Sequence, residues 1–189
     1  MTTVPSHYRE VLYWKLSGSL RRQIVVNVLV FPLAAIAGAG FGWFSRQVGQ
    51  LPPVVVGAPE LLALLVSLIL AVALHELVHG LAMQFYGARP QYGVLWLALA
   101  FYATAPGQAF RRNQYLVVGL GPLVGLSLLA LLGMVVFAGT PWVGLLAVCA
   151  TLNAAGSIGD LWIVGIVVRY PPHAYVVDER DGMRIFLPG

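Results

Sequence analysis

Three side chains that could bind and use a metal ion lie within five residues of one another. His75 and His79 are four positions apart, and Glu76 follows the first histidine. Residues four apart on a helix lie one turn apart on the same face, so both imidazoles can reach one ion. A carboxylate beside such a pair can take a proton from metal-bound water without being a ligand. The pattern therefore predicts a Zn²⁺ site with two histidine ligands and Glu76 as general base.

The alternative is that these side chains are polar groups satisfied by hydrogen bonds inside a helix bundle. The surrounding sequence favours the metal site, because residues 61–85 contain no other His, Asp, Glu, Lys or Arg. Ionisable groups are expensive in an apolar environment and are usually functional when they occur there. A site with two histidines and a carboxylate accepts iron or cobalt as well as zinc, so the metal itself stays a prediction.

A catalytic zinc needs a third protein ligand and one open position. Asp160 is the only charged residue between 142 and 168, and it lies nine residues before Arg169. The histidines also lie near the C-terminal end of their own apolar stretch, so we expect a similar depth and predict Asp160 as the third ligand. The alternative is a lone aspartate hydrogen-bonded to a neighbouring helix. The other candidate ligands are less suitable. His7 and His173 lie in the polar segments outside the apolar stretches, and Glu60 lies at the opposite end of the second stretch from the histidines.

A further polar residue shares the helix of Asp160. Asn153 precedes it by seven residues, which places the two on one face. We expect Asn153 either to bind substrate backbone, to orient a metal ligand, or to form a hydrogen bond between helices.

Gly121 and Gly125 favour close helix approach, and Pro122 between them frees a backbone carbonyl.

The elements that carry these residues are predicted to be membrane spans. The chain is 59% hydrophobic and 10% charged, whereas a soluble domain is about 25% charged. A span needs roughly 20 apolar residues. We therefore predict an all-α polytopic membrane protein of about four transmembrane helices, with a short hairpin or re-entrant segment at 91–105 between the second and third. The predicted spans are 24–44, 60–86, 114–138 and 142–168.

The basic residues predict the orientation of these spans. Lys and Arg precede the first span, separate the second from the third and follow the fourth, whereas the opposite side holds only Arg46. Both termini are therefore predicted to be cytoplasmic, with segment 1–23 and tail 169–189 enclosing a metalloprotease domain at 24–168. The basic residues stand singly or in pairs, which argues against nucleic acid as a partner. The single cysteine, Cys149, excludes an intrachain disulfide and a cysteine-rich zinc site.

The sequence resembles two groups of membrane metalloproteases. The run at 157–162 and the tail at 171–186 are similar to a bacterial and archaeal family of zincin peptidases, and this resemblance covers most of the chain from about residue 60 onward. The motifs shared with the three-helix core of site-2 proteases are HELVHG at 75–80, GPL at 121–123, Asn153 and Asp160.

The resemblance implies zinc held by His75, His79 and Asp160, with Glu76 as general base and the 91–105 segment guiding an unwound substrate. It also implies a prokaryotic cell membrane as the location, and a membrane protein or peptide as the substrate. Two positions depart from the site-2 protease pattern. Ala154 follows Asn153 where a proline is usual, and Leu161 follows Asp160 where a glycine is usual.

We therefore predict a zinc metalloendopeptidase that hydrolyses peptide bonds of membrane-embedded substrates near the cytoplasmic face. The rival functions are a non-proteolytic metal-binding or metal-transport membrane protein and an inactive relative that acts as a scaffold. An ion path would need polar residues along the span, yet Ser67 is the only one between residues 61 and 74. Metal binding alone would not require Glu76. Nothing in the sequence points to an oligomeric state.

Overall fold

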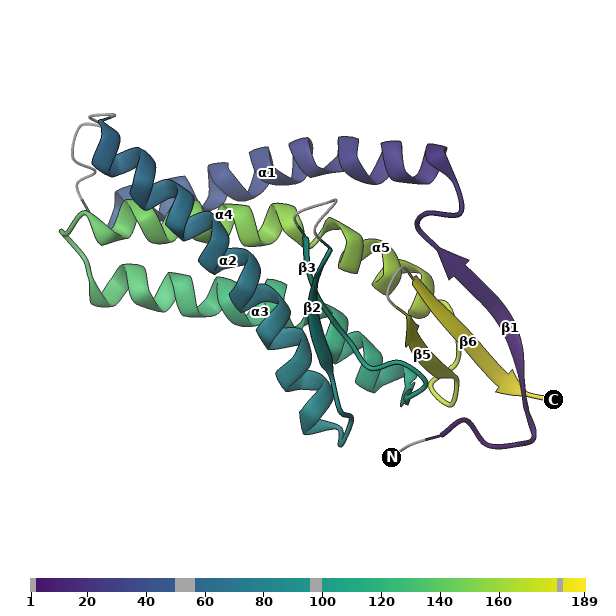
Figure 1. The fold of residues 1–189 in the computed structure, drawn as a ribbon. Helices are drawn as coiled ribbons and strands as arrows, with labels where there is room; N and C mark the ends of the chain where they lie inside the picture. Colours follow the sequence, from purple (N-terminus) through teal and green to yellow (C-terminus); the bar gives the residue numbers. More distant parts are fainter. Residues whose placement is uncertain (1–2, 50–56, 96–99, 180–181) are drawn as a thin grey trace. The chain divides into compact units, whose positions relative to one another are not determined.

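The computed structural model of the chain describes residues 3–49, 57–95, 100–179 and 182–189 (Figure 1). Helices account for most of it. Those in the described residues are α1 (Leu20–Val48), α2 (Ala58–Phe85), α3 (Arg112–Val136), α4 (Trp142–Gly156) and α5 (Ile158–Val167). The strands there are β1 (Tyr8–Lys15), β2 (Gln91–Leu95), β3 (Ala100–Thr104), β4 (Ala109–Arg111), β5 (Tyr175–Glu179) and β6 (Gly182–Pro188).

Three of the helices are long and apolar enough to cross a membrane: α1, α2 and α3. The fourth predicted span is broken into α4 and α5, which together count as a fourth candidate. The break falls at Ser157, whose hydroxyl and N–H both donate to the carbonyl of Asn153. A serine that bonds back to the preceding turn competes with the regular helical bond and commonly bends a helix. The predicted span at 142–168 is therefore bent by 44°, and the prediction that Asn153 and Asp160 share one helix is wrong, because they stand on α4 and α5.

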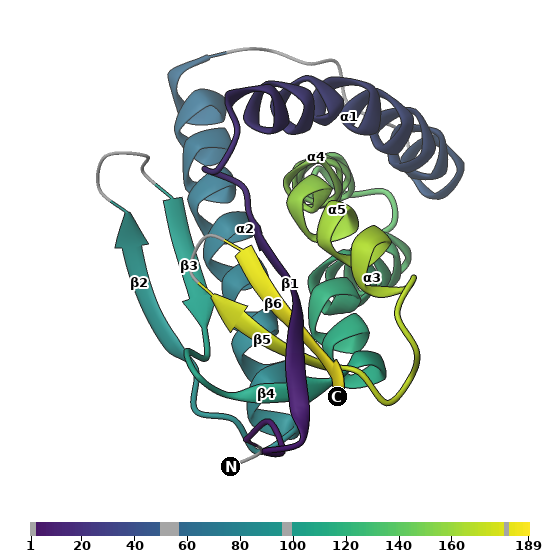
Figure 2. The same cartoon turned by 90° about the vertical axis from the view of Figure 1, so that its right-hand side faces the viewer.

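The prediction of an all-α protein is also wrong, because the described residues form two sheets (Figure 2). The larger sheet has the order β1-β6-β5-β4, with antiparallel pairing throughout. Strand β1 comes from the N-terminal end, β4 from the middle, and β5 and β6 from the C-terminal end, so that Tyr8 pairs with Pro188. A local sequence pattern carries no information about a partner that far away, so short terminal strands leave only a weak signal.

The smaller sheet is the hairpin predicted as one alternative for 91–105. Strands β2 and β3 pair antiparallel from Gln91 opposite Thr104 to Leu95 opposite Ala100. The segment is therefore a β-hairpin and not a re-entrant helix in the residues described, while its tip at 96–99 lies outside them. Gly93 faces Tyr102 across the ladder, and the Tyr102 ring covers the space where a side chain at Gly93 would stand.

The chain forms two compact units, each with its own core. One comprises Met1–Asn27, Glu76–Gly121 and Gly159–Gly189 and includes both sheets. Its core is built around Phe110, Met183 and Ile185, which are almost fully buried. The other comprises Val28–His75 and Pro122–Ile158. Its core is formed by small and medium residues, which suits close helix packing: Ala130, Met134, Val143, Ala147 and Ala150.

The pairing of β1 with β6 depends on a close backbone approach at Gly182. A Cβ at this position would overlap the backbone carbonyl of Trp14, which belongs to the opposite strand. We expect Gly182→Ala to lower the free energy of unfolding by about 1–3 kcal/mol, because backbone cannot rotate aside as a side chain can. Thermal unfolding in detergent checks this. Gly40→Ala in α1 is the control, since a Cβ there meets no atom within 4 Å, and equal melting of the two variants would contradict the expectation.

Candidate metal centre

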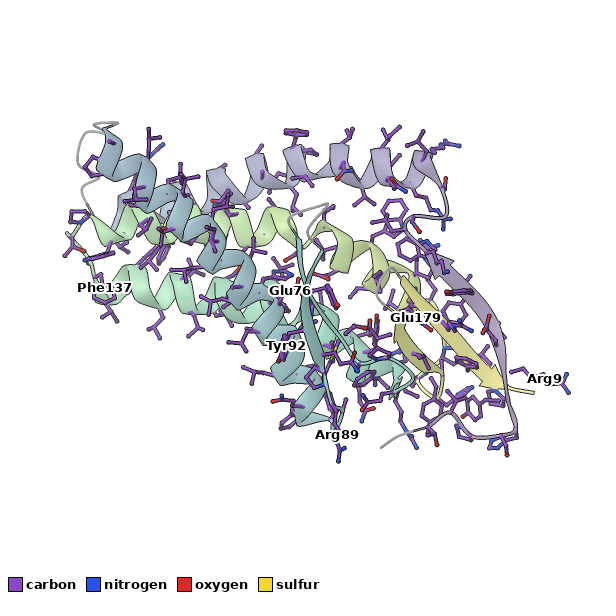
Figure 3. All side chains as sticks on the ribbon, in the orientation of Figure 1. Arg9, Glu76, Arg89, Tyr92, Phe137 and Glu179 are labelled. Carbon is purple, nitrogen blue, oxygen red and sulfur yellow. The ribbon has the colours of Figure 1, made fainter. Side chains whose placement is uncertain are left out.

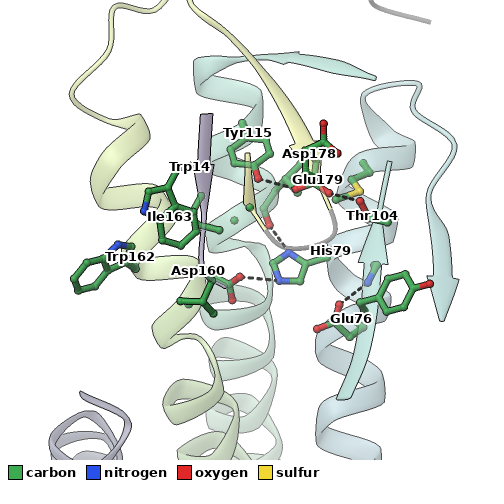
Figure 4. A pocket seen from close by; sticks show the side chains of 18 of the residues that line it. Trp14, Glu76, His79, Thr104, Tyr115, Asp160, Trp162, Ile163, Asp178 and Glu179 are labelled. Carbon is green, nitrogen blue, oxygen red and sulfur yellow. Dashed lines mark hydrogen bonds and ion pairs between the residues drawn. The ribbon is translucent and has the colours of Figure 1, made fainter. Parts of the chain in front are cut away.

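Three of the side chains singled out from the sequence form a group that could hold a metal ion. One ligand atom from each of His75, His79 and Asp160 lies within 4.8 Å of the others. The histidines lie one turn apart on α2, and Asp160 stands in the first turn of α5. Nε2 of His79 lies 3.3 Å from a carboxylate oxygen of Asp160 (Figure 4). Both histidines are nearly buried, with 9% and 8% of their surface exposed.

A proline in α3 makes one partner available to His79. Nδ1 of His79 lies 2.9 Å from the backbone oxygen of Val118. In a regular helix that oxygen would accept the N–H of residue 122, but residue 122 is proline and has no N–H. Because a carbonyl can only accept, Nδ1 of His79 carries the proton of a neutral ring. The lone pair is then on Nε2, the atom that faces Asp160.

The orientation of His75 is fixed through Asn153. The amide nitrogen of Asn153 donates to the backbone oxygen of Pro122 at 3.1 Å, so its amide oxygen is the atom 3.0 Å from Nδ1 of His75. Nδ1 of His75 must therefore donate, as Nδ1 of His79 does. Of the three roles considered for Asn153, these contacts match two: the orientation of His75 and a hydrogen bond between helices.

The donor set fits zinc. Each histidine has its Nδ1 proton committed to an oxygen, which is how metal-binding histidines are usually held. At His79 the remaining ring nitrogen and the Asp160 carboxylate are both acceptors when the ring is neutral, and they lie 3.3 Å apart. Two acceptors at that distance need a proton or a cation between them. Two imidazoles and one carboxylate are also the protein ligands of many catalytic zinc sites.

Glu76 stands beside this group and not in it. Its carboxylate accepts a hydrogen bond of 2.7 Å from the backbone N–H of Ala103 in β3. Glu76, His79 and Asp160 line one cavity of about 230 Å³. The cavity also has aromatic walls, formed by Trp14, Tyr102, Tyr115 and Trp162. The arrangement leaves a carboxylate facing the same space as two of the candidate ligands.

The hairpin is docked on this turn of α2 at a second point. A Cβ on Gly80, the residue after His79, would overlap the ring and hydroxyl of Tyr92 in β2. Figure 3 shows Glu76 and Tyr92 where the hairpin crosses α2. Glycine at position 80 therefore lets β2 lie directly against the helix that carries the histidines.

Several residues of the site were not identified from the sequence. Val118 could have been found, because a proline in a helix frees the carbonyl four residues before it. Asp178 in β5 gave no such signal. It accepts hydrogen bonds of 2.7 Å from Thr104 and from Tyr115, and burial raises the pKa of its carboxyl while these bonds partly counter the rise. The two histidines set aside earlier, His7 and His173, are exposed and lie outside the metal group.

One comparison with known proteins finds a match. The family model described as "Putative zincin peptidase" matches residues 68–175, which include the two histidines, Glu76, Asn153 and Asp160. No curated protein and no solved structure matches the chain. The match covers more than half of the 189 residues, and it contains the whole candidate metal group. The chain therefore belongs to this zincin peptidase family.

Proposed function

We propose that this protein is an intramembrane zinc metalloprotease that hydrolyses peptide bonds of membrane-embedded substrates near the cytoplasmic face. The observation that carries the proposal is the shared cavity, in which Glu76 accompanies His79 and Asp160. The family match supports a zinc peptidase. Location within the membrane is supported by the apolar helices, and the likeness to site-2 proteases adds the subtype.

His75, His79 and Asp160 are the residues that would hold zinc. Zinc held there would lower the pKa of a bound water to about 7 and would polarise a carbonyl. Glu76 accepts the proton of the attacking water at its carboxylate and passes it to the leaving amine. The Ala103 N–H fixes this carboxylate from the side of the hairpin. Asn153 and the Val118 carbonyl keep both imidazoles in the tautomer that presents Nε2.

The hairpin offers a place for the substrate backbone. Ala103 of β3 donates its N–H to Glu76, so this donor is already bound and faces away from β2. An extended peptide that adds to the hairpin as a further strand would lie near Glu76, as in other cases of strand addition. A helical substrate must first unwind, because its own hydrogen bonds occupy its carbonyls.

The surface of α2 supports a position within the bilayer. Large apolar side chains along it are exposed, among them Leu62 at 63% and Leu65 at 58%, which water would disfavour and lipid would not. His75 precedes the helix end at Phe85 by ten residues, or roughly 15 Å of helix. The basic residues Arg89, Arg111 and Arg112 follow that end. We propose that this end of α2 lies at the cytoplasmic face of a prokaryotic cell membrane and that both termini are cytoplasmic.

The ligand assignment predicts metal content. His79→Ala and Asp160→Ala should each reduce bound zinc at least tenfold, because two remaining ligands hold the ion poorly. Elemental analysis of the purified, detergent-solubilised chain measures this. His173→Ala should keep wild-type zinc, since that side chain is exposed and outside the group. Wild-type zinc in both ligand variants would remove the site.

Glu76 separates a protease from a metal-binding or transport protein. Glu76→Gln should keep the zinc and lower the cleavage of a transmembrane peptide panel by about 10²–10⁴-fold, because the amide cannot accept the water proton. Glu10→Gln, which alters an exposed carboxylate on β1, should cleave like the wild type. If Glu76→Gln cleaves as fast as the wild type, Glu76 is not the base. If the wild type binds zinc but cleaves no peptide, the result favours a non-proteolytic metal-binding or transport function.

The proline in α3 gives a third test. Pro122→Ala restores the N–H that competes with His79 for the Val118 oxygen. We expect zinc affinity to fall about 10–100-fold, while the metal-free protein melts at the same or a higher temperature, because alanine is the better helix former. Competition with a fluorescent chelator measures the affinity. Pro32→Ala removes a proline from α1 and should leave zinc affinity unchanged. Unchanged affinity in Pro122→Ala would contradict the proposed role of Val118.

A further inference from the structure

One carboxylate connects the C-terminal part of the chain to the hairpin beside Glu76. Asp178 lies in β5, and its two oxygens accept separate hydrogen bonds. The Thr104 hydroxyl donates to one oxygen and the Tyr115 hydroxyl to the other, each at 2.7 Å. The backbone N–H of Ala105 is a further donor to Asp178. Strands β3 and β5 and helix α3 therefore meet at this side chain (Figure 4).

These bonds are adjacent to the one that holds Glu76. Ala103 donates its N–H to Glu76, Thr104 donates its hydroxyl to Asp178, and Ala105 donates its N–H to Asp178. In an extended chain the N–H groups of alternate residues point to the same edge. Two carboxylates thus bind neighbouring donors on the outer edge of β3 and its continuation. If Asp178 releases this segment, the N–H that holds Glu76 is free to shift with it.

Burial makes this contact hard to replace with water. Thr104 has 1% of its surface exposed and Tyr115 has 4%. A buried hydroxyl or carboxylate that loses its partner stays without a substitute, so the bonds favour one position of the segment. The strand that carries this carboxylate is fixed on both sides, because the backbone of β5 pairs with β4 and with β6. The neighbouring Glu179 forms an ion pair with Arg184 of β6 instead.

We propose that Asp178 is a positioning residue that fixes strand β3 so that the Ala103 amide holds Glu76 in the cavity with His79 and Asp160. The sheet formed by the chain ends is then part of the hydrolytic machinery. This inference rests on the proposed proteolytic function.

The test compares Thr104→Val with Thr104→Ser in the full-length, zinc-loaded protein. Valine has the shape of threonine without the hydroxyl, and serine keeps the hydroxyl. Hydrogen exchange at residues 100–105 should accelerate roughly tenfold in Thr104→Val, because one buried hydrogen bond is lost. The kcat for a cleaved transmembrane peptide should fall by a similar factor, with KM and zinc content little changed. Thr104→Ser should restore exchange and kcat.

Two further variants separate positioning from general stability. Asp178→Asn should accelerate the same exchange, because it weakens the acceptor for all three donors. Glu10→Gln, which alters an exposed carboxylate on β1 outside the cavity, should change neither exchange nor kcat. Unchanged exchange in both Thr104→Val and Asp178→Asn would overturn the positioning role, whatever the protein cleaves. Faster exchange with unchanged kcat would overturn the link to Glu76. If the wild type cleaves no peptide, the proposed function fails, and the catalytic part of this inference fails with it.

Discussion

The hydrogen bond between Nδ1 of His79 and the carbonyl of Val118 is the contact on which the geometry of the candidate metal centre depends. It exists because α3 contains a proline four residues later, which leaves that carbonyl without its usual helical donor. The bond fixes the tautomer and turns Nε2 toward Asp160. The same proline accepts the amide of Asn153 through its own carbonyl, and Asn153 orients His75. Two carbonyls one turn apart on α3, those of Val118 and Pro122, therefore serve the two histidines.

The surroundings of the site are apolar, so each of its polar groups needs a hydrogen-bond or ionic partner within the protein. A histidine in such a place loses its hydration, so both its nitrogens need partners. Here each Nδ1 has an oxygen of α3 or α4, and the opposite edge of His79 faces a carboxylate. Such an arrangement is typical of a metal ligand. The family match points to the same chemistry.

Local sequence patterns were enough to predict features that lie within single helices. The HELVHG run, the apolar stretches and Asp160 needed only periodicity, hydropathy and charge, and His75, His79 and Asp160 lie together in the structure. The addition of β1 and β4 to the C-terminal strands could not be found in this way, because β1 pairs with β6 across almost the whole chain and β4 lies more than 60 residues before β5. Asp178 was missed for the same reason: its importance depends on Thr104 and Tyr115, which are 74 and 63 residues away. The break at Ser157 was missed because its hydroxyl bond changes no hydropathy.

The hairpin contacts the HELVHG segment of α2 at two points and so joins the strands to the residues of the candidate site. Tyr92 of β2 lies over Gly80, and Ala103 of β3 donates to Glu76, so the hairpin contacts α2 on either side of His79 in the sequence. The C-terminal sheet holds the next residue of β3, Thr104, through Asp178. These contacts fix the base of the hairpin beside the proposed general base, Glu76. An extended substrate added to the hairpin as a strand would be aligned by backbone bonds, which do not depend on its side chains. Selectivity would then come from how readily a substrate helix unwinds and from the aromatic walls of the cavity.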